Sequence, residues 1–154
     1  MLLVKNKNGF SLIEVLITLG VLVILLVAMT PSFFNFYHRY QLQTKTQETI
    51  QVLRLAQSLS MAGQNGEVYG VRLITGWGGG MVLFQGHQFD GRDQDYDQEY
   101  LLPQSVSLSA TVSDNEVLFN KFEGSTQDIG TITISSAAGS KSITINQTGR
   151  IDLQ

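Results

Sequence analysis

The stretch that decides the fold reads GFSLIEVLITLGVLVILLVAM, from Gly9 to Met29. A helix rises about 1.5 Å per residue, so a run of this length matches a hydrocarbon core of roughly 30 Å. We therefore predict an N-terminal helix whose first half, residues 10–30, is transmembrane. Lys5 and Lys7 lie on its N-terminal flank, so the positive-inside rule places that end in the cytoplasm and the rest of the chain outside.

A cleaved secretory signal peptide does not fit this segment, because the apolar run is too long and no small-x-small cleavage site follows it. A plain membrane anchor fits the run, but Glu14 argues against it. A carboxylate near the start of an apolar span costs a few kcal/mol, so it needs a functional explanation. If the chain were cut after Gly9, the new α-amino group of Phe10 on a neighbouring subunit could pair with Glu14 and set the register of packed helices. The alternative is that Glu14 lies close enough to the interface to stay hydrated.

The helical pattern continues beyond Pro31. Spacings of 3, 1 and 3 place four apolar side chains on one helical face: Val52, Leu55, Ala56 and Leu59. We predict one helix over residues 10–61, bent at Pro31. Five aromatic residues fit either the membrane boundary or a helix–sheet core: Phe33, Phe34, Phe36, Tyr37 and Tyr40.

From Glu67 onward the apolar residues recur with a period of two, which is typical of strands. We predict six to seven strands, at residues 67–74, 81–84, 106–112, 117–122, 129–135, 142–145 and 150–153. The glycine-rich residues 76–80 are predicted to form a flexible connection, and residues 137–140 a hairpin turn. The expected fold class is α+β, with a long helix followed by a mainly antiparallel sheet domain over residues 62–154.

Charge and composition exclude several functions. Residues 62–154 hold five basic and eleven acidic residues, a net charge of −6, which gives no general attraction to nucleic acid. The chain has no cysteine, and its two histidines, His38 and His87, are far apart in sequence. No catalytic constellation is present in the sequence, so we expect neither an enzyme nor a cofactor.

The acidic stretch Asp93-x-Asp95-x-Asp97 has the alternation of a calcium-binding loop. It lacks the glycine at the sixth position and the distal glutamate of such loops. We predict a solvated acidic loop, with weak calcium binding by Asp93, Asp95 and Asp97 as the alternative.

The string from Gly9 to Glu14, with basic residues before it and the apolar run after it, resembles the N-terminal signal of type IV prepilins and type II secretion pseudopilins. This resemblance implies a leader peptide over residues 1–9, which prepilin peptidase removes between Gly9 and Phe10, and N-methylation of Phe10. It also implies that Glu14 supports assembly and that Pro31 is the helix-kinking proline. The implied partners are other pilins or pseudopilins and an inner-membrane assembly platform.

The C-terminal body is similar to that of minor pseudopilin H and FimT-like minor pilins, above all in Thr148-Gly149-Arg150-Ile151. Members that bind DNA carry a basic C-terminal region, whereas here only Arg150 stands near the end, beside Asp152. DNA binding is therefore not expected.

The sequence thus predicts a structural, minor subunit of a type IV pilus or a type II secretion pseudopilus. It would be a single-pass protein of the inner membrane that later joins an extracellular or periplasmic filament. The alternative is a tip-located pilin that binds DNA or a surface ligand, with Trp77 and the acidic stretch as candidate contacts.

Overall fold

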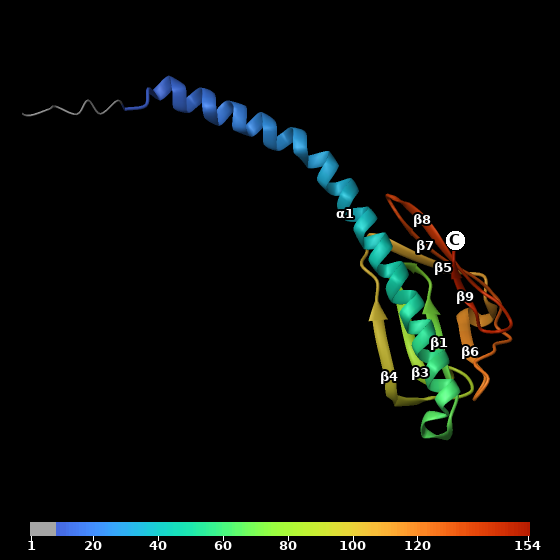
Figure 1. Ribbon diagram of the computed structural model, residues 1–154. Coiled ribbons are helices and arrows are strands. Elements are labelled where there is room, and N and C mark those ends of the chain that lie inside the picture. The colour runs from blue at the N-terminus through green and yellow to red at the C-terminus, as the bar shows by residue number, and fades with distance from the viewer. Residues whose placement is uncertain (1–8) are drawn as a thin grey trace, which may run out of the picture. The chain divides into compact units, whose positions relative to one another are not determined.

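A computed structural model describes residues 9–154, without the side chains of residues 28–32. It divides into an N-terminal unit, Met1–Phe36, and a body, Tyr37–Gln154. One helix, α1, runs from Leu12 to Ala62 and contributes residues to both (Figure 1). The predicted fold class, a long helix followed by antiparallel sheets, is confirmed.

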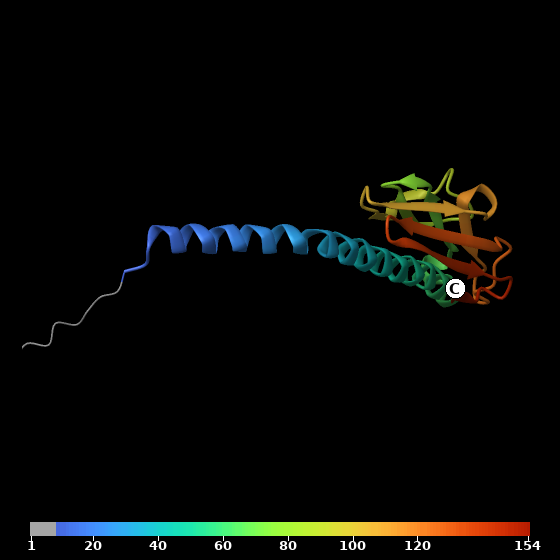
Figure 2. The same cartoon turned by 90° about the horizontal axis from the view of Figure 1, so that it is seen from above.

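The body contains two antiparallel sheets, with strand orders β4-β3-β1-β6 and β2-β5-β7-β8-β9. Figure 2 views them from above, with β1 and β3 in green and β7 to β9 in orange and red. The strands are β1 (Tyr69–Ile74), β2 (Gly76–Trp77), β3 (Gly80–Gln85), β4 (Asp93–Leu101), β5 (Val106–Ala110), β6 (Glu116–Phe119), β7 (Gly130–Ser136), β8 (Gly139–Ile145) and β9 (Ile151–Leu153). Two short 3₁₀ turns, Gln64–Gly66 and Ser113–Asn115, connect α1 to β1 and β5 to β6.

Two of these strands correct the sequence-based predictions. The acidic stretch is not a loop, because residues Asp93–Leu101 form β4, which pairs with β3. The connection over residues 76–80 is partly ordered, because Gly76 and Trp77 form β2 against β5. Neither segment has the composition of a strand, so each owes its extended conformation to the neighbour with which it pairs.

The second half of α1 packs on the body through a stripe that differs from the predicted face. Leu53 and Ala56 are fully buried, whereas Leu55, predicted to be buried, is exposed. The stripe also contains three buried polar residues, Thr46, Thr49 and Ser60, which a search for apolar periodicity overlooks. The Thr46 hydroxyl donates to the carbonyl of Leu42 at 2.7 Å, and the Thr49 hydroxyl to that of Lys45 at 2.8 Å, so burial leaves them satisfied.

Helix α1 ends at Ala62, one residue beyond the predicted end at residue 61, and Gly63 follows it. This glycine adopts φ 59°, a left-handed conformation that costs an L side chain energy, and its N–H donates to the carbonyl of Ser60. The Ser60 hydroxyl accepts the N–H of Tyr69 at 2.8 Å, which ties the helix end to β1. Tyr69 donates its phenolic hydrogen to Gln85, and burial raises the pKa of Tyr69 above its usual value.

Gln57 of α1 holds two distant loops of the body together. Its side-chain N–H group donates to the carbonyls of Gly124 and Gly149 at 2.8 and 2.9 Å. Gly149 has φ 77°, and a Cβ there would lie 1.9 Å from the Gly124 carbonyl oxygen. The glycine of the Thr148-Gly149-Arg150 sequence is therefore required by close packing between two backbone segments.

We predict that Gly149→Ala destabilises the body far more than Gly66→Ala. Gly66 has nearly the same backbone conformation, φ 74°, but open space around it. The control substitution should cost about 1–2 kcal/mol of left-handed backbone strain, and the clash at residue 149 should add about 1–3 kcal/mol. Urea unfolding followed by circular dichroism measures both. Equal losses in the two variants would contradict the packing argument.

Candidate assembly segment and surfaces

The predicted processing site, Gly9 and Phe10, lies before the first turn of α1. Phe10 is 84% exposed, and nothing lies within 4 Å of a Cβ built on Gly9. The carbonyl of Ser11 accepts the N–H groups of Glu14 and Val15, which starts the helix. The described side of the junction is therefore uncovered and lies outside any regular secondary structure. The leader, residues 1–8 with Lys5 and Lys7, lies outside the described residues.

Glu14 lies in the first turn of α1 and is exposed. Among residues 9–154 no ion pair involves its carboxylate. A carboxylate in the first helical turn is stabilised by the exposed N–H groups and the dipole of that turn, which is worth about 0.3–1 kcal/mol. That position leaves the charge available to a cation from outside the chain.

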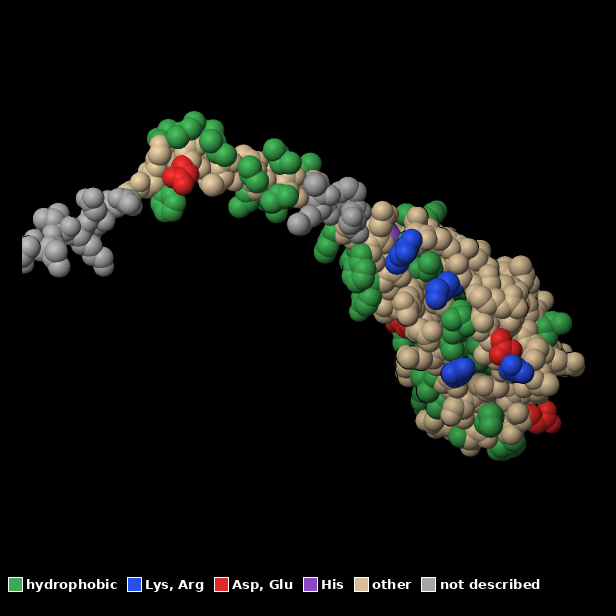
Figure 3. All heavy atoms as spheres, turned by 45° about the horizontal axis from the view of Figure 1, so that its top comes forward, with side chains coloured by type: hydrophobic (Ala, Val, Ile, Leu, Met, Phe, Trp, Pro, Cys, Tyr) green, Lys and Arg blue, Asp and Glu red, His purple; other side chains and the backbone are tan. Residues whose placement is uncertain are grey.

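The described part of α1 in the N-terminal unit has no polar face. Its large apolar side chains from Leu12 to Val27 are all exposed, and Figure 3 shows some of them on the visible face. Residues 21–27 are apolar at every position, so with 3.6 residues per turn they point in every direction around the helix. The hydroxyl of Thr18, one of the few polar groups here, donates to the carbonyl of Val15 at 2.9 Å. A helix that is apolar all round needs apolar surroundings, either lipid or other helices.

Among the described residues, no helix meets the length and apolarity needed to span a membrane. The predicted transmembrane half, residues 10–30, includes positions 28–30, whose side chains lie outside those described. Pro31 lies within the bounds of α1, but its side chain is also outside those described. The bend predicted at this proline stays a prediction.

The aromatic residues predicted at the membrane boundary or in a core are all exposed. Phe33, Phe34 and Phe36 belong to the N-terminal unit, and Tyr37 and Tyr40 to the body. Within the body, Tyr37 and Tyr40 line a groove of about 500 Å³ together with Leu101 and Pro103. The interpretation as a helix–sheet core does not apply to these two rings.

The proposed calcium ligands do not converge. Asp93, Asp95 and Asp97 occupy alternate positions of β4, which spreads them over about 13 Å. Both carboxylate oxygens of Asp97 accept from the Arg92 guanidinium, at 3.0 and 2.9 Å, and that guanidinium lies 3.5 Å from the centre of the Phe89 ring. No group of three or more potential ligands that could hold a metal ion occurs in the described part of the chain. The calcium hypothesis therefore gains no support.

The candidate contacts for DNA or a surface ligand lie apart. Trp77 is 63% exposed on β2, at an edge of the five-stranded sheet. The acidic stretch forms an edge of the other sheet. Near the C-terminus, the guanidinium of Arg150 pairs with the carboxylate of Asp152 at 2.9 Å. The structure thus brings none of these residues together into one binding site.

Comparisons with known proteins agree with this picture. Residues 4–30 match the family model of the prokaryotic N-terminal methylation motif. The fold is similar to the crystal structure of the type IV minor pilin FimU of Pseudomonas aeruginosa, with a TM-score of 0.58, 18% sequence identity, and coverage of 77% of this chain and 92% of that one. The comparison with functionally curated proteins gives no match.

Proposed function

We propose that this chain is a member of the type IV pilin superfamily and a structural subunit of the minor class in a filament. The match of residues 4–30 to the prokaryotic N-terminal methylation motif and the similarity to the fold of a type IV minor pilin support the proposal. The filament is a type IV pilus or a type II secretion pseudopilus. The observation that carries the proposal is the all-round apolar helix with a carboxylate in its first turn that forms no ion pair among residues 9–154. This helix is an anchor in the inner membrane before assembly and part of the filament core afterwards.

Processing supplies a cation for Glu14, which has no ion pair among residues 9–154. Prepilin peptidase cuts between Gly9 and Phe10 and methylates the new amino group of Phe10. Within one chain, Phe10 precedes the helix that begins at Leu12 and contains Glu14, and a direct ion pair along this one chain is awkward. The amine of a neighbouring subunit has no such restriction, and the pair fixes how far one helix is shifted along the next.

The acidic charge of residues 62–154 favours a structural role over DNA binding. Residues 62–154 carry a net charge of −6, and Arg150, the basic residue nearest the C-terminus, is paired with Asp152. Nucleic-acid affinity rests on phosphate neutralisation by lysine and arginine, so this surface repels a phosphate backbone.

The first prediction concerns processing. Mass spectrometry of the protein purified from its native membrane should find a chain that begins at Phe10 and carries one additional methyl group. In a Gly9→Leu variant the leader, residues 1–9, should remain attached, because the larger side chain before the cleavage site no longer fits the peptidase. A wild-type chain with an intact Met1 end would contradict the processing step.

The second prediction concerns assembly. Glu14→Ala should leave membrane insertion intact, because it removes a charge from an apolar span, yet it should abolish incorporation into filaments. Thr18→Ala is the matched control, since it removes a polar group one turn later that already bonds within the helix. Fractionation and immunoblotting of sheared filaments measure incorporation. Normal incorporation of the Glu14 variant would remove the basis for its role.

The third prediction separates a structural subunit from a DNA-binding tip pilin. In a mobility-shift assay at 50 mM salt, the full chain in nonionic detergent should not retard double-stranded DNA. A tight shift that disappears at higher salt would favour the tip pilin instead.

A further inference from the structure

Strand β4 forms an edge of the four-stranded sheet, and nothing in the described part of the chain pairs with its outer side. In Figure 1 it lies at the margin of the body, beside the second half of α1. Most of its residues are exposed. An edge of this kind offers backbone N–H and C=O groups to another extended chain.

The ladder between β3 and β4 identifies which backbone groups are open. The N–H of Leu102 donates to the carbonyl of Gly79 at 2.8 Å, and the register continues with Met81 opposite Tyr100 and Val82 opposite Glu99. Hydrogen-bonded and non-hydrogen-bonded pairs alternate in an antiparallel ladder. Tyr100 therefore bonds to β3, whereas the N–H and C=O of Glu99 point away from the sheet.

The carbonyl of Leu101, the next one in β4 that points away from the sheet, supports this assignment. Lys45 Nζ reaches the carbonyl of Leu101 from α1, at 3.4 Å, which requires that carbonyl to point away from β3. The backbone of Glu99, two residues earlier, has no such partner among the described residues. A single residue of an incoming antiparallel strand could exchange two hydrogen bonds with it.

The side chains of β4 define the chemistry of the occupant. Four carboxylates lie on β4, at Asp93, Asp95, Asp97 and Glu99. The register against β3 shifts between Gln98 and Asp93, so side chains alternate regularly between the two faces only from Gln98 to Leu101. Asp97 is neutralised by Arg92. Glu99 has no ion pair among residues 9–154, and it lies directly opposite the position that would take the incoming residue. Opposite charges stabilise such a cross-strand pair and like charges destabilise it.

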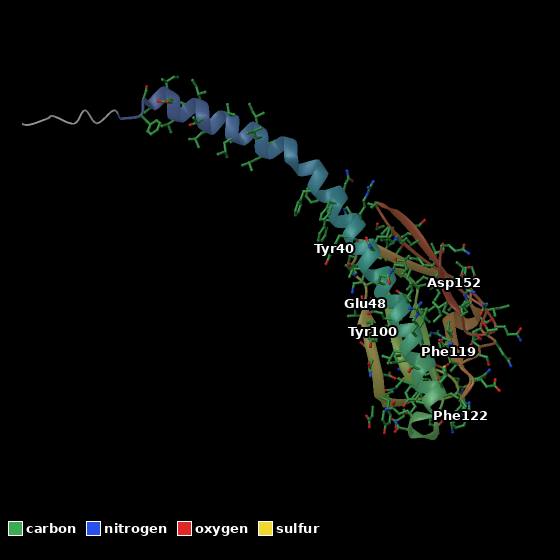
Figure 4. The ribbon with its side chains drawn as sticks, in the orientation of Figure 1. Tyr40, Glu48, Tyr100, Phe119, Phe122 and Asp152 are labelled. Carbon is green, nitrogen blue, oxygen red and sulfur yellow. The ribbon has the colours of Figure 1, made fainter. Side chains whose placement is uncertain are left out.

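The C-terminal end of β4 adds an apolar contact. Leu101, which is 67% exposed, borders the groove that Tyr37, Tyr40 and Pro103 also line. Figure 4 labels Tyr40 and Glu48 on α1 and Tyr100 on β4. By alternation Leu101 shares the face of Glu99, whereas Tyr100 lies on the other face and packs against the core. An extended segment along β4 would place every second side chain on the face that Tyr100 occupies. Apolar side chains suit those positions.

We propose that the outer edge of β4 binds an extended segment of a partner protein by strand addition, and that this segment alternates basic and apolar residues. A basic residue lies opposite Glu99, and the apolar residues on either side of it lie on the face of Tyr100. A second copy of β4 that sets its Glu99 against this Glu99 is disfavoured as occupant, because it places like charges directly opposite each other. The proposal concerns the body alone and does not rest on the processing or assembly of the N-terminal helix.

The test uses the full chain in nonionic detergent and a fluorescent eight-residue peptide of alternating lysine and valine, capped at both ends. Fluorescence anisotropy should detect binding that weakens with salt. The lysine opposite Glu99 donates its own N–H to β4, whereas the valine N–H groups point away. N-methylation of the lysine amides should therefore abolish binding, and N-methylation of the valine amides should preserve it.

Two substitutions test the edge from the side of the protein. Glu99→Pro removes an outward N–H and the carboxylate, spares the ladder to β3, and should weaken binding about tenfold through one lost hydrogen bond and the lost charge pair. Glu99→Lys should also weaken binding, whereas Glu123→Lys, which reverses an exposed carboxylate away from β4, should not. Circular dichroism checks that each variant folds. If the proline variant does not fold, the two lysine variants and the two N-methylated peptides provide the test.

Three outcomes would overturn the proposal: equal binding of both methylated peptides, unchanged binding by both Glu99 variants, or no binding of the parent peptide.

Discussion

A helix with apolar side chains on every side constrains everything else in this protein. Burying one such side chain is worth about 1.5–3 kcal/mol, so the exposed run from Leu12 to Val27 represents more free energy than the 5–15 kcal/mol that stabilises a typical domain. The helix must therefore always be surrounded by apolar atoms. Lipid tails and neighbouring helices satisfy that need about equally, because lipid is as apolar as leucine. The hydrophobic effect alone cannot favour a filament over a membrane.

Glu14 supplies the missing preference. In lipid its carboxylate is a cost, and among the described residues it has no partner that would offset that cost. In a bundle of processed helices, a neighbouring amine turns the same group into a stabilising contact. In the assembly that we propose, the difference between these two states, rather than the strength of the ion pair itself, drives the subunit out of the membrane. A single polar residue at the start of the run is enough, and more would compromise the anchor.

The sequence predicts the parts of this protein whose signals are local. The Gly9-to-Glu14 string, the stop at Gly63 and the alternating strands β1, β5 and β7 all depend on neighbouring residues, and they fall where expected. The misses depend on tertiary contacts. Leu55 has the right spacing for the buried face, but the stripe that packs on the body runs through Leu53 and is completed by Thr46, Thr49 and Ser60. Gly149 is fixed by a carbonyl from a distant loop, which no local pattern records.

Strand β4 is the most informative of the wrong predictions, because its carboxylates both made it look like a loop and determine what its edge can bind. Alternating carboxylates lower β-propensity and look like a solvated loop, so only pairing with β3 makes the segment extended. Charged side chains on an edge strand are one way in which natural sheets avoid edge-to-edge aggregation. Repulsion of that kind is selective, since it penalises an acidic strand whereas a basic strand gains attraction. The charges on β4 therefore determine which strand can bind more than how tightly it binds.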